Sequence, residues 1–132
     1  MGSDKPSLRK RRVLVVEDDE DSREFIRTVV EKEECECVTA RTASDALRLC
    51  DTGVFDMIVL DLVLPDGFGL SVARHITKLG TKTAIVVVSA YLERLDPATY
   101  PMFGIKRLIR KPFKVEEIRK ALAEEPPPPA AN

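Results

Sequence analysis

The chain has 132 residues, which is enough sequence for one domain with its own hydrophobic core. Its hydrophobic content of 44% excludes a largely disordered chain, and its net charge of −1 argues against nucleic-acid binding through overall positive charge. No apolar run is long enough to cross a membrane and no signal peptide is evident, so we expect a cytoplasmic protein without membrane contact.

Three segments are expected along the chain. A flexible N-terminal arm occupies residues 1–11, a single domain occupies 12–124, and a proline-rich tail or linker occupies 125–132. The three cysteines have no zinc-binding spacing, and we interpret them as reduced thiols that fill the core. These cysteines are Cys35, Cys37 and Cys50.

Short apolar runs predict the strands of a sheet. Three of them, Val13–Val16, Met57–Leu60 and Ala84–Val88, are continuously apolar and rich in β-branched residues. This pattern is typical of strands that are covered on both faces, as in a parallel sheet. Two weaker runs, Cys35–Ala40 and Arg107–Arg110, are expected at the edges of that sheet.

Between these strands, apolar residues recur at the spacing of amphipathic helices. The four stripes are Phe25, Ile26, Val29 and Val30; Ala43, Ala46, Leu47 and Cys50; Val72, Ile76 and Leu79; and Val115, Ile118 and Leu122. A further helix between Tyr91 and Gly104 is expected to be short or irregular, because it contains two prolines. Asp96 would cap its start with Pro97 in the first turn, and Pro101 would end it within about one turn.

Strands that alternate with helices predict right-handed β-α-β crossovers and a doubly wound α/β fold. Ligands of such folds bind beyond the carboxyl ends of the strands, so the residues that follow each strand are the candidate site. They are Glu17, Asp18 and Asp19 after the first predicted strand, Asp61 after the third, Ser89 after the fourth and Lys111 after the fifth.

These residue types suit phosphoryl chemistry. Neighbouring acids about 4 Å apart repel each other by roughly 4 kcal/mol per pair, so the cluster needs a cation. Clustered carboxylates bind a hard divalent cation such as Mg²⁺, an ammonium or hydroxyl binds phosphoryl oxygens, and a central carboxylate can act as nucleophile. The later acids of this run, Asp19, Glu20 and Asp21, are expected to stabilise the start of a helix through its dipole, with Asp19 at the border between the two groups.

Four motifs, "VLVVEDD", "VLDLVLPDGFGL", "VVVSA" and "RKPF", follow one another between Val13 and Leu122. In this order and spacing the sequence resembles the receiver domain of bacterial two-component response regulators. The resemblance implies a flavodoxin-like (βα)5 fold with a five-stranded parallel sheet of order 2-1-3-4-5. It also implies a phosphorylation-dependent switch in a phosphorelay, whose donor is a histidine kinase or a histidine phosphotransfer protein. Such a domain is a regulatory phosphoacceptor that only phosphorylates and dephosphorylates itself.

The resemblance also implies a role for each site residue. Asp61 would accept the phosphoryl group. Mg²⁺ or Mn²⁺ would be bound by Asp18, Asp61, the backbone carbonyl of Val63 and, through water, Glu17. The other implied positions are Ser89 and Lys111 as phosphoryl-binding residues, Pro112 as a cis proline that shapes the Lys111 loop, and Gly69 at the start of the third helix.

The sequence departs from the family pattern near the expected signalling face. Leu108 stands where receivers usually have an aromatic residue on the fifth strand, so we expect a different readout, namely an order–disorder change in Leu92–Gly104.

Val63 has no polar group to orient water, and Tyr91 is large enough to screen the site. We therefore expect a slowly hydrolysing aspartyl phosphate.

Two other functions remain open from the sequence. An aspartate-nucleophile phosphatase of the haloacid dehalogenase type needs a second Asp two residues after the nucleophile, but Val63 follows Asp61 there. Asp19 and Asp21 have that spacing, but Arg23 occupies the next motif position. The second alternative is a receiver-like binding module that is not phosphorylated.

The output domain or target is unknown, a homodimer is left open, and no direct nucleic-acid contact by this domain is expected.

Overall fold

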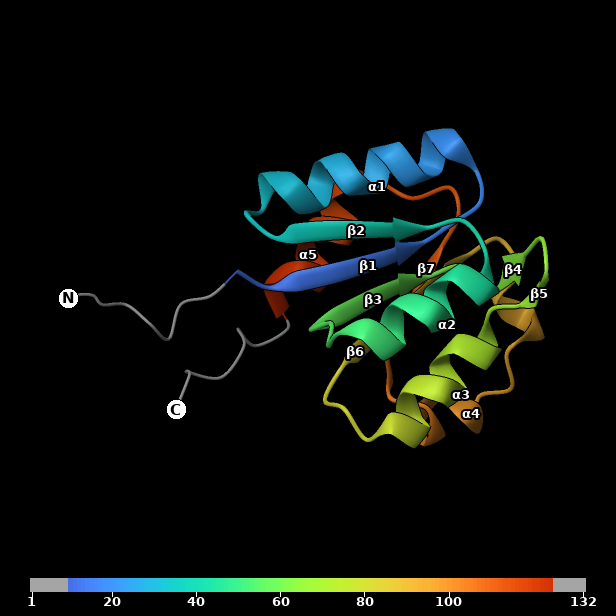
Figure 1. Cartoon of the computed structure of the whole chain (residues 1–132). Coiled ribbons are helices and arrows are strands. Elements are labelled where there is room, and N and C mark those ends of the chain that lie inside the picture. The colour runs from blue at the N-terminus through green and yellow to red at the C-terminus, as the bar shows by residue number, and fades with distance from the viewer. Residues whose placement is uncertain (1–9, 125–132) are drawn as a thin grey trace.

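Five parallel strands form the centre of the computed structural model, which describes residues 10–124 (Figure 1). The strands are β1 (Arg12–Val16), β2 (Glu36–Ala40), β3 (Met57–Leu60), β6 (Ala84–Ser89) and β7 (Ile105–Arg110). Their order is β2-β1-β3-β6-β7, which confirms the predicted doubly wound sheet, its strand order and its two edge strands. Most of the expected arm at 1–11, and all of the expected tail at 125–132, lie outside the described residues.

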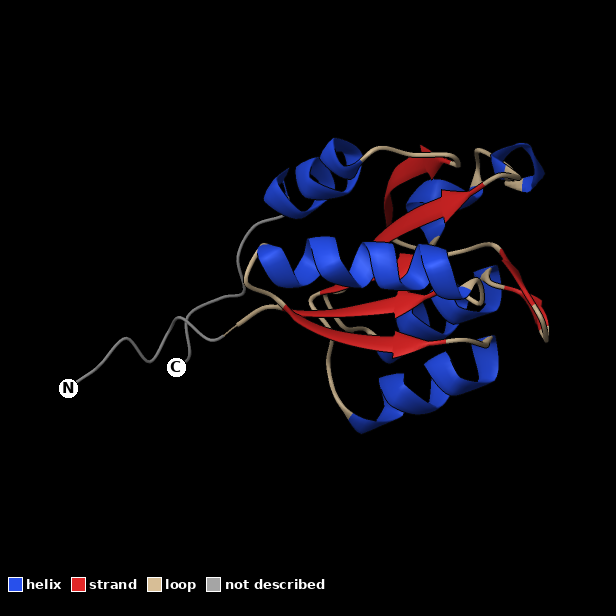
Figure 2. Cartoon of the chain, turned by 90° about the horizontal axis from the view of Figure 1, so that it is seen from above, coloured by secondary structure: helices blue, strands red, loops and turns tan. Residues whose placement is uncertain are grey.

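Helices cover both faces of the sheet (Figure 2). One layer consists of α1 (Glu20–Lys32) and α5 (Val115–Glu124), and the other of α2 (Ala43–Thr52) and α3 (Leu70–Leu79). Side chains of each central strand alternate between the two layers. In β1, for example, Leu14 and Val16 pack with the α2 and α3 residues, whereas Val13 and Val15 pack with those of α1 and α5. Burial on both faces explains the continuous apolarity of these strands.

The predicted helical stripes face these two cores. Most of their members are buried, and Leu47 and Val115 are partly buried. Leu79 and Phe25 are the exceptions, with 44% and 40% of their surface exposed. The ring of Phe25 lies edge-on to Phe113, with 5.7 Å between the ring centroids.

The first helix begins as its acidic residues predict. The carboxylate of Asp19 accepts a hydrogen bond from the backbone N–H of Ser22 at 2.9 Å and caps α1. Glu20 and Asp21 lie in the first turn, where their charge favours the positive end of the helix dipole. The acidic run after β1 is therefore divided between a helix start and the residues before it.

A small hairpin after β3 was not predicted. It pairs β4 (Val63–Leu64) with β5 (Gly67–Phe68) around a Pro65-Asp66 turn, and it lies at the carboxyl edge of the sheet. Both carboxylate oxygens of Asp66 accept backbone N–H bonds at 2.9 Å, one from Ala43 and one from Ser44. These bonds lower the pKa of Asp66 and cap the start of α2 from a distant part of the chain.

The segment after β6 contains a 3₁₀ turn, η1 (Leu92–Arg94), and a four-residue helix, α4 (Thr99–Met102). The segment is short and irregular as expected, and the carboxylate of Asp96 accepts from the N–H of Ala98 in the turn before α4. The predicted length of about one turn is right, but the helix extends one residue past Pro101. Pro101 lies inside α4, because the first turn of a helix leaves N–H groups without intrahelical acceptors and so tolerates proline.

The cysteines are free thiols that contribute to the two cores. Cys35 and Cys50 are buried, Cys37 is half-buried, and burial raises the pKa of Cys37 and of Cys50 to about 11. This confirms the interpretation that they fill the core. Within residues 10–124, no helix has the length and apolarity that crossing a membrane requires.

Candidate functional site

Three ionisable residues of the site come directly after strands and are positioned by the sheet itself. The backbone N–H of Glu17 donates to the carbonyl of Ala40, and that of Asp61 donates to Val16, each at 3.0 Å. The N–H of Lys111 donates to the carbonyl of Ser89 at the same distance. The hydrogen-bond ladder thus continues one residue beyond the strands, and it fixes the backbone that carries the three side chains.

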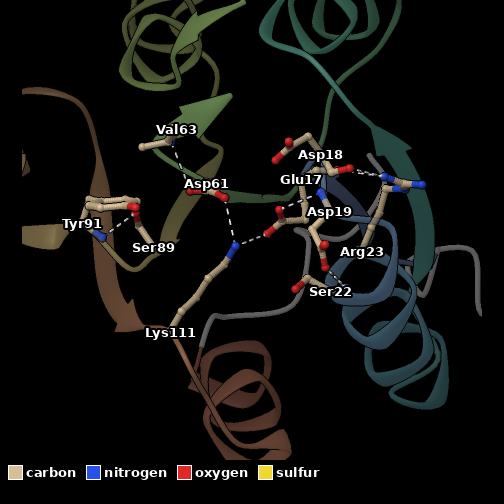
Figure 3. Close-up of polar contacts among 10 residues, drawn as sticks. All are labelled: Glu17, Asp18, Asp19, Ser22, Arg23, Asp61, Val63, Ser89, Tyr91 and Lys111. Atoms are coloured by element: carbon tan, nitrogen blue, oxygen red, sulfur yellow. Dashed lines mark hydrogen bonds and ion pairs between the residues drawn. The ribbon is translucent and has the colours of Figure 1, made fainter. Parts of the chain in front are cut away.

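The Lys111 ammonium lies between two buried carboxylates (Figure 3). Its Nζ is 2.6 Å from Oε1 of Glu17 and 2.9 Å from Oδ2 of Asp61. Glu17 is only 2% exposed and Asp61 only 7%. The second oxygen of each carboxylate accepts a backbone N–H at 3.1 Å, from Asp19 and Val63 respectively. Both acids are therefore held in fixed orientations, as buried charged groups require.

The pKa shifts show how burial and pairing compete at this site. Burial raises the pKa of Glu17, and the hydrogen bonds from Lys111 and from the Asp19 N–H offset this only in part. Burial also opposes the charge of Lys111, but its bonds to Glu17 and Asp61 outweigh that effect and raise the pKa of Lys111. The ammonium therefore stays charged, while the carboxylates retain an unfavourable excess of negative charge.

Asp18 adds a third carboxylate on the solvent side of this group. Oxygens of Glu17, Asp18 and Asp61 lie within 4.8 Å of one another, and Asp18 is exposed. The three acids line a cleft of about 290 Å³ with Lys111. Carboxylates that converge on a hydrated opening are the donor set that Mg²⁺ prefers, because this ion keeps several waters. The residues present therefore fit a hard divalent cation.

Gly69 allows the chain to pass close behind Asp61. A Cβ atom at Gly69 would lie 2.1 Å from the carbonyl oxygen of Asp61, far inside van der Waals contact. The N–H of Gly69 also donates to the carbonyl of Leu62 at 2.6 Å. Only glycine fits here, so the start of α3 and the position of Asp61 depend on each other.

Val63 and Tyr91 stand at the entrance of the cleft and line it. They are 37% and 44% exposed, and the guanidinium of Arg94 lies 4.8 Å from the centre of the Tyr91 ring. Ser89 is fully buried and is not among the residues that line the cleft. Its hydroxyl oxygen accepts the backbone N–H of Tyr91 at 3.0 Å, and a hydroxyl that accepts a bond can still donate its own proton.

Two further positions from the sequence lie apart from the carboxylates. The peptide bond between Lys111 and Pro112 is cis, the isomer that the resemblance implied. Leu108 lies opposite Val87 in the β6–β7 pairing and packs against the core formed with α2 and α3. It is not among the residues that line the cleft.

Sequence reasoning missed one residue that contacts the site. Nη1 of Arg23 donates to the backbone carbonyls of Glu17 and Asp18, at 3.1 and 3.2 Å. Its position on α1 was predictable from the sequence. Its hydrogen bonds to loop carbonyls were not, because the spacing of apolar residues carries no information about such bonds. The cap made by Asp66 was missed too, although proline, aspartate and glycine in a row are a turn signal.

Comparisons with known proteins agree with this geometry. The model of the response regulator receiver domain family matches residues 13–123. Among curated proteins, transcriptional regulatory protein DltR of Streptococcus agalactiae is 31% identical over 107 residues, which are 81% of this chain and 48% of DltR. Sensor histidine kinase AruS of Pseudomonas aeruginosa is 32% identical over 116 residues, 85% of this chain and 12% of AruS. The chain thus spans about half of DltR and a small part of AruS.

Solved structures give the same result. The response regulator protein TrrA of Thermotoga maritima, in complex with Mg²⁺-BeF, is 27% identical to this chain with a TM-score of 0.77. The alignment covers 88% of this chain and 99% of TrrA.

The close approach at Gly69 predicts a large cost for a single methyl group. Gly69→Ala should lower the free energy of unfolding by more than about 2 kcal/mol, because backbone must move against backbone. Gly53→Ala is the matched control, since its Cβ would meet only the flexible end of Arg12. Urea denaturation of both variants measures the difference. Equal stabilities of the two variants would contradict the inferred contact.

Proposed function

The chain belongs to the response regulator receiver domain family, the phosphoacceptor switches of two-component systems, and we propose that its phosphoacceptor is Asp61. The observation that carries the proposal is the Lys111 ammonium, 2.9 Å from Oδ2 of a buried Asp61 at the mouth of an acidic cleft. An Asp61 oxygen attacks the phosphorus of a phosphohistidine. The bond from phosphorus to the imidazole nitrogen breaks as the new bond to oxygen forms, and the imidazole keeps the electron pair.

The residues around Asp61 have complementary roles in this transfer. Lys111 pairs with a phosphoryl oxygen after leaving Asp61, and the Ser89 hydroxyl turns to donate to another. Mg²⁺ or Mn²⁺ would be held by Asp18, Asp61 and the carbonyl of Val63, and by Glu17 through water. When bound, the cation neutralises the negative charge that develops on the phosphoryl oxygens. Mg²⁺-dependent self-phosphorylation and self-dephosphorylation would use the same residues.

Receiver domains work between a histidine kinase and an output. For this chain we propose a histidine kinase or a histidine phosphotransfer protein as the donor. Two relatives, a transcriptional regulatory protein and a sensor histidine kinase, are longer than this chain. We therefore propose that the receiver domain works with an output domain or a kinase domain, which can belong to the same polypeptide. Homodimer formation remains a separate proposal that oligomeric state measured by light scattering would test.

Phosphotransfer to three variants tests this assignment and separates it from an unphosphorylated binding module. We expect Asp61→Asn to accept no phosphoryl group, and Asp18→Asn to lose at least about tenfold in Mg²⁺-dependent rate, because a ligand is removed. Asp21→Asn is the control, since Asp21 lies in the first turn of α1 and should affect only helix stability. The measurement is stoichiometric, hydroxylamine-sensitive labelling from a phosphohistidine donor. Labelling of Asp61→Asn at the parent level would exclude Asp61 as acceptor.

The entrance of the cleft supports a second proposal, that the aspartyl phosphate is long-lived. Val63 offers no polar group to orient an attacking water, and the Tyr91 ring, with the guanidinium of Arg94 beside it, adds bulk to the lining of the cleft. A Val63→Asn, Tyr91→Ala double variant should lose its phosphoryl group at least about tenfold faster, a barrier lower by about 1.4 kcal/mol. The readout is the decay of the label after removal of the donor. An unchanged decay rate would contradict the screening role.

The segment after β6 supports a third proposal, that residues 92–104 change their order on phosphorylation. Leu95 is its only residue in the buried core, with Leu92 and Phe103 partly buried beside it, among the residues whose burial is described. Its start is tied to Ser89 through the Tyr91 N–H. Amide hydrogen exchange in this segment should differ by at least about tenfold with and without Mg²⁺ and beryllofluoride. Equal protection in both states would exclude this readout.

A further inference from the structure

Arg23 connects helix α1 to the backbone of the acidic residues after β1. Its Nη1 donates to the carbonyl oxygens of Glu17 and Asp18, at 3.1 and 3.2 Å, and the side chain is half-buried. The backbone N–H of Arg23 donates to the carbonyl of Asp19 at 2.9 Å, which anchors this residue in the helix. Figure 3 shows Arg23 on the other side of Glu17 from Lys111.

The contact orders the part of the site that the sheet does not hold. The N–H of Glu17 is bonded to β2, but the carbonyls of Glu17 and Asp18 lie in the connection between strand and helix. Hydrogen bonds from a charged donor are stronger than neutral ones, so the guanidinium is well suited to fix these carbonyls. In the described part of the chain Arg23 forms no ion pair with a carboxylate, so the charges of the acids stay available to a ligand.

We propose that Arg23 is a positioning residue that strengthens divalent-cation binding, although it carries positive charge itself. By fixing the backbone of Glu17 and Asp18, it keeps their carboxylates within 4.8 Å of each other and of Asp61 before the cation arrives. The cation then meets a preformed site and does not have to order a loop. This inference rests on the proposed cation site.

Arg27, one turn further along α1, provides the comparison. Its guanidinium contacts Thr39 and forms ion pairs with Glu24 and Glu31. It has the same charge and lies on the same helix, but none of these contacts involves the acidic loop. The two arginines therefore separate an effect of the loop contact from an effect of positive charge on the helix.

The sign of the effect distinguishes positioning from simple electrostatics. If Arg23 acted only through its charge, its removal would reduce repulsion and tighten Mg²⁺ binding. If Arg23 fixes the loop, its removal weakens binding, because the carboxylates then have to be ordered by the cation. The two explanations predict changes in opposite directions.

Mg²⁺ titrations of the full chain, followed by the amide NMR signals of the acidic loop, test the proposal. Arg23→Met should raise the dissociation constant about tenfold, the size expected for loss of a group that orients metal ligands. Arg23→Lys keeps the charge, but its amine does not reach the position of Nη1, so its dissociation constant should rise at least about threefold. Arg27→Met should change it by less than about twofold, since distant sites act independently.

Each variant is titrated at a temperature where its far-ultraviolet circular dichroism shows it folded. If Arg23→Met does not fold, Arg23→Lys decides the question. Affinity equal to or tighter than that of the parent in the folded Arg23 variants would overturn the positioning role and leave the cation site intact. A parent chain that binds no Mg²⁺ would overturn the cation site itself, and with it this inference.

Discussion

The balance of charge around Lys111 is the constraint on which this structure depends. One ammonium contacts two carboxylates that the fold buries, Glu17 and Asp61, and the exposed Asp18 adds a third acid within 4.8 Å. At about 4 Å and an effective dielectric constant near 20, each like-charged pair costs about 4 kcal/mol, and one ammonium does not offset three acids. A divalent cation would restore neutrality. Phosphorylation replaces the single negative charge of the Asp61 carboxylate with the roughly two charges of a phosphoryl group, so about one further negative charge is added and the cation becomes more necessary still.

The positions of these charged residues are fixed by backbone contacts and not by the interactions between their charges. The ladder bonds of Glu17, Asp61 and Lys111 are made by the backbone and belong to the sheet. Behind Asp61, the close passage at Gly69 leaves the strand end no room to relax. The unfavourable charge is therefore kept by the fold as a whole, whose two apolar cores supply the necessary stability. The side chains can change partners while their starting points stay fixed.

The parts of this arrangement that could be predicted are those that periodicity encodes. Continuous apolar runs identified the central strands, and the topology of a doubly wound sheet then brought Asp61 and Lys111 to one edge, although they are 50 positions apart. Contacts made by single polar side chains could not be found in this way. The Asp66 cap on α2 joins residues more than 20 positions apart, and Arg23 bonds to carbonyls that every residue possesses. Pro101 was misjudged because its effect depends on which turn of a helix it occupies.

The hydrogen bond between Ser89 and Tyr91 connects the site to the segment of residues 92–104. Leu108 offers no polar group that could change partner, so the coupling that we propose to residues 92–104 begins at Ser89. That hydroxyl lies outside the cleft and accepts the Tyr91 N–H, so turning towards a ligand either pulls the Tyr91 backbone along or leaves its N–H without an acceptor. Tyr91 is 44% exposed, so losing this bond costs about the net value of one hydrogen bond, roughly 1 kcal/mol, which shifts a two-state equilibrium about fivefold. The chain that follows consists of a 3₁₀ turn and a four-residue helix, with Leu95 as its buried anchor, and so has little structure to resist the change. In the readout that we propose, this weak segment next to a rigid site responds to phosphorylation, where other receivers have an aromatic residue at the position of Leu108.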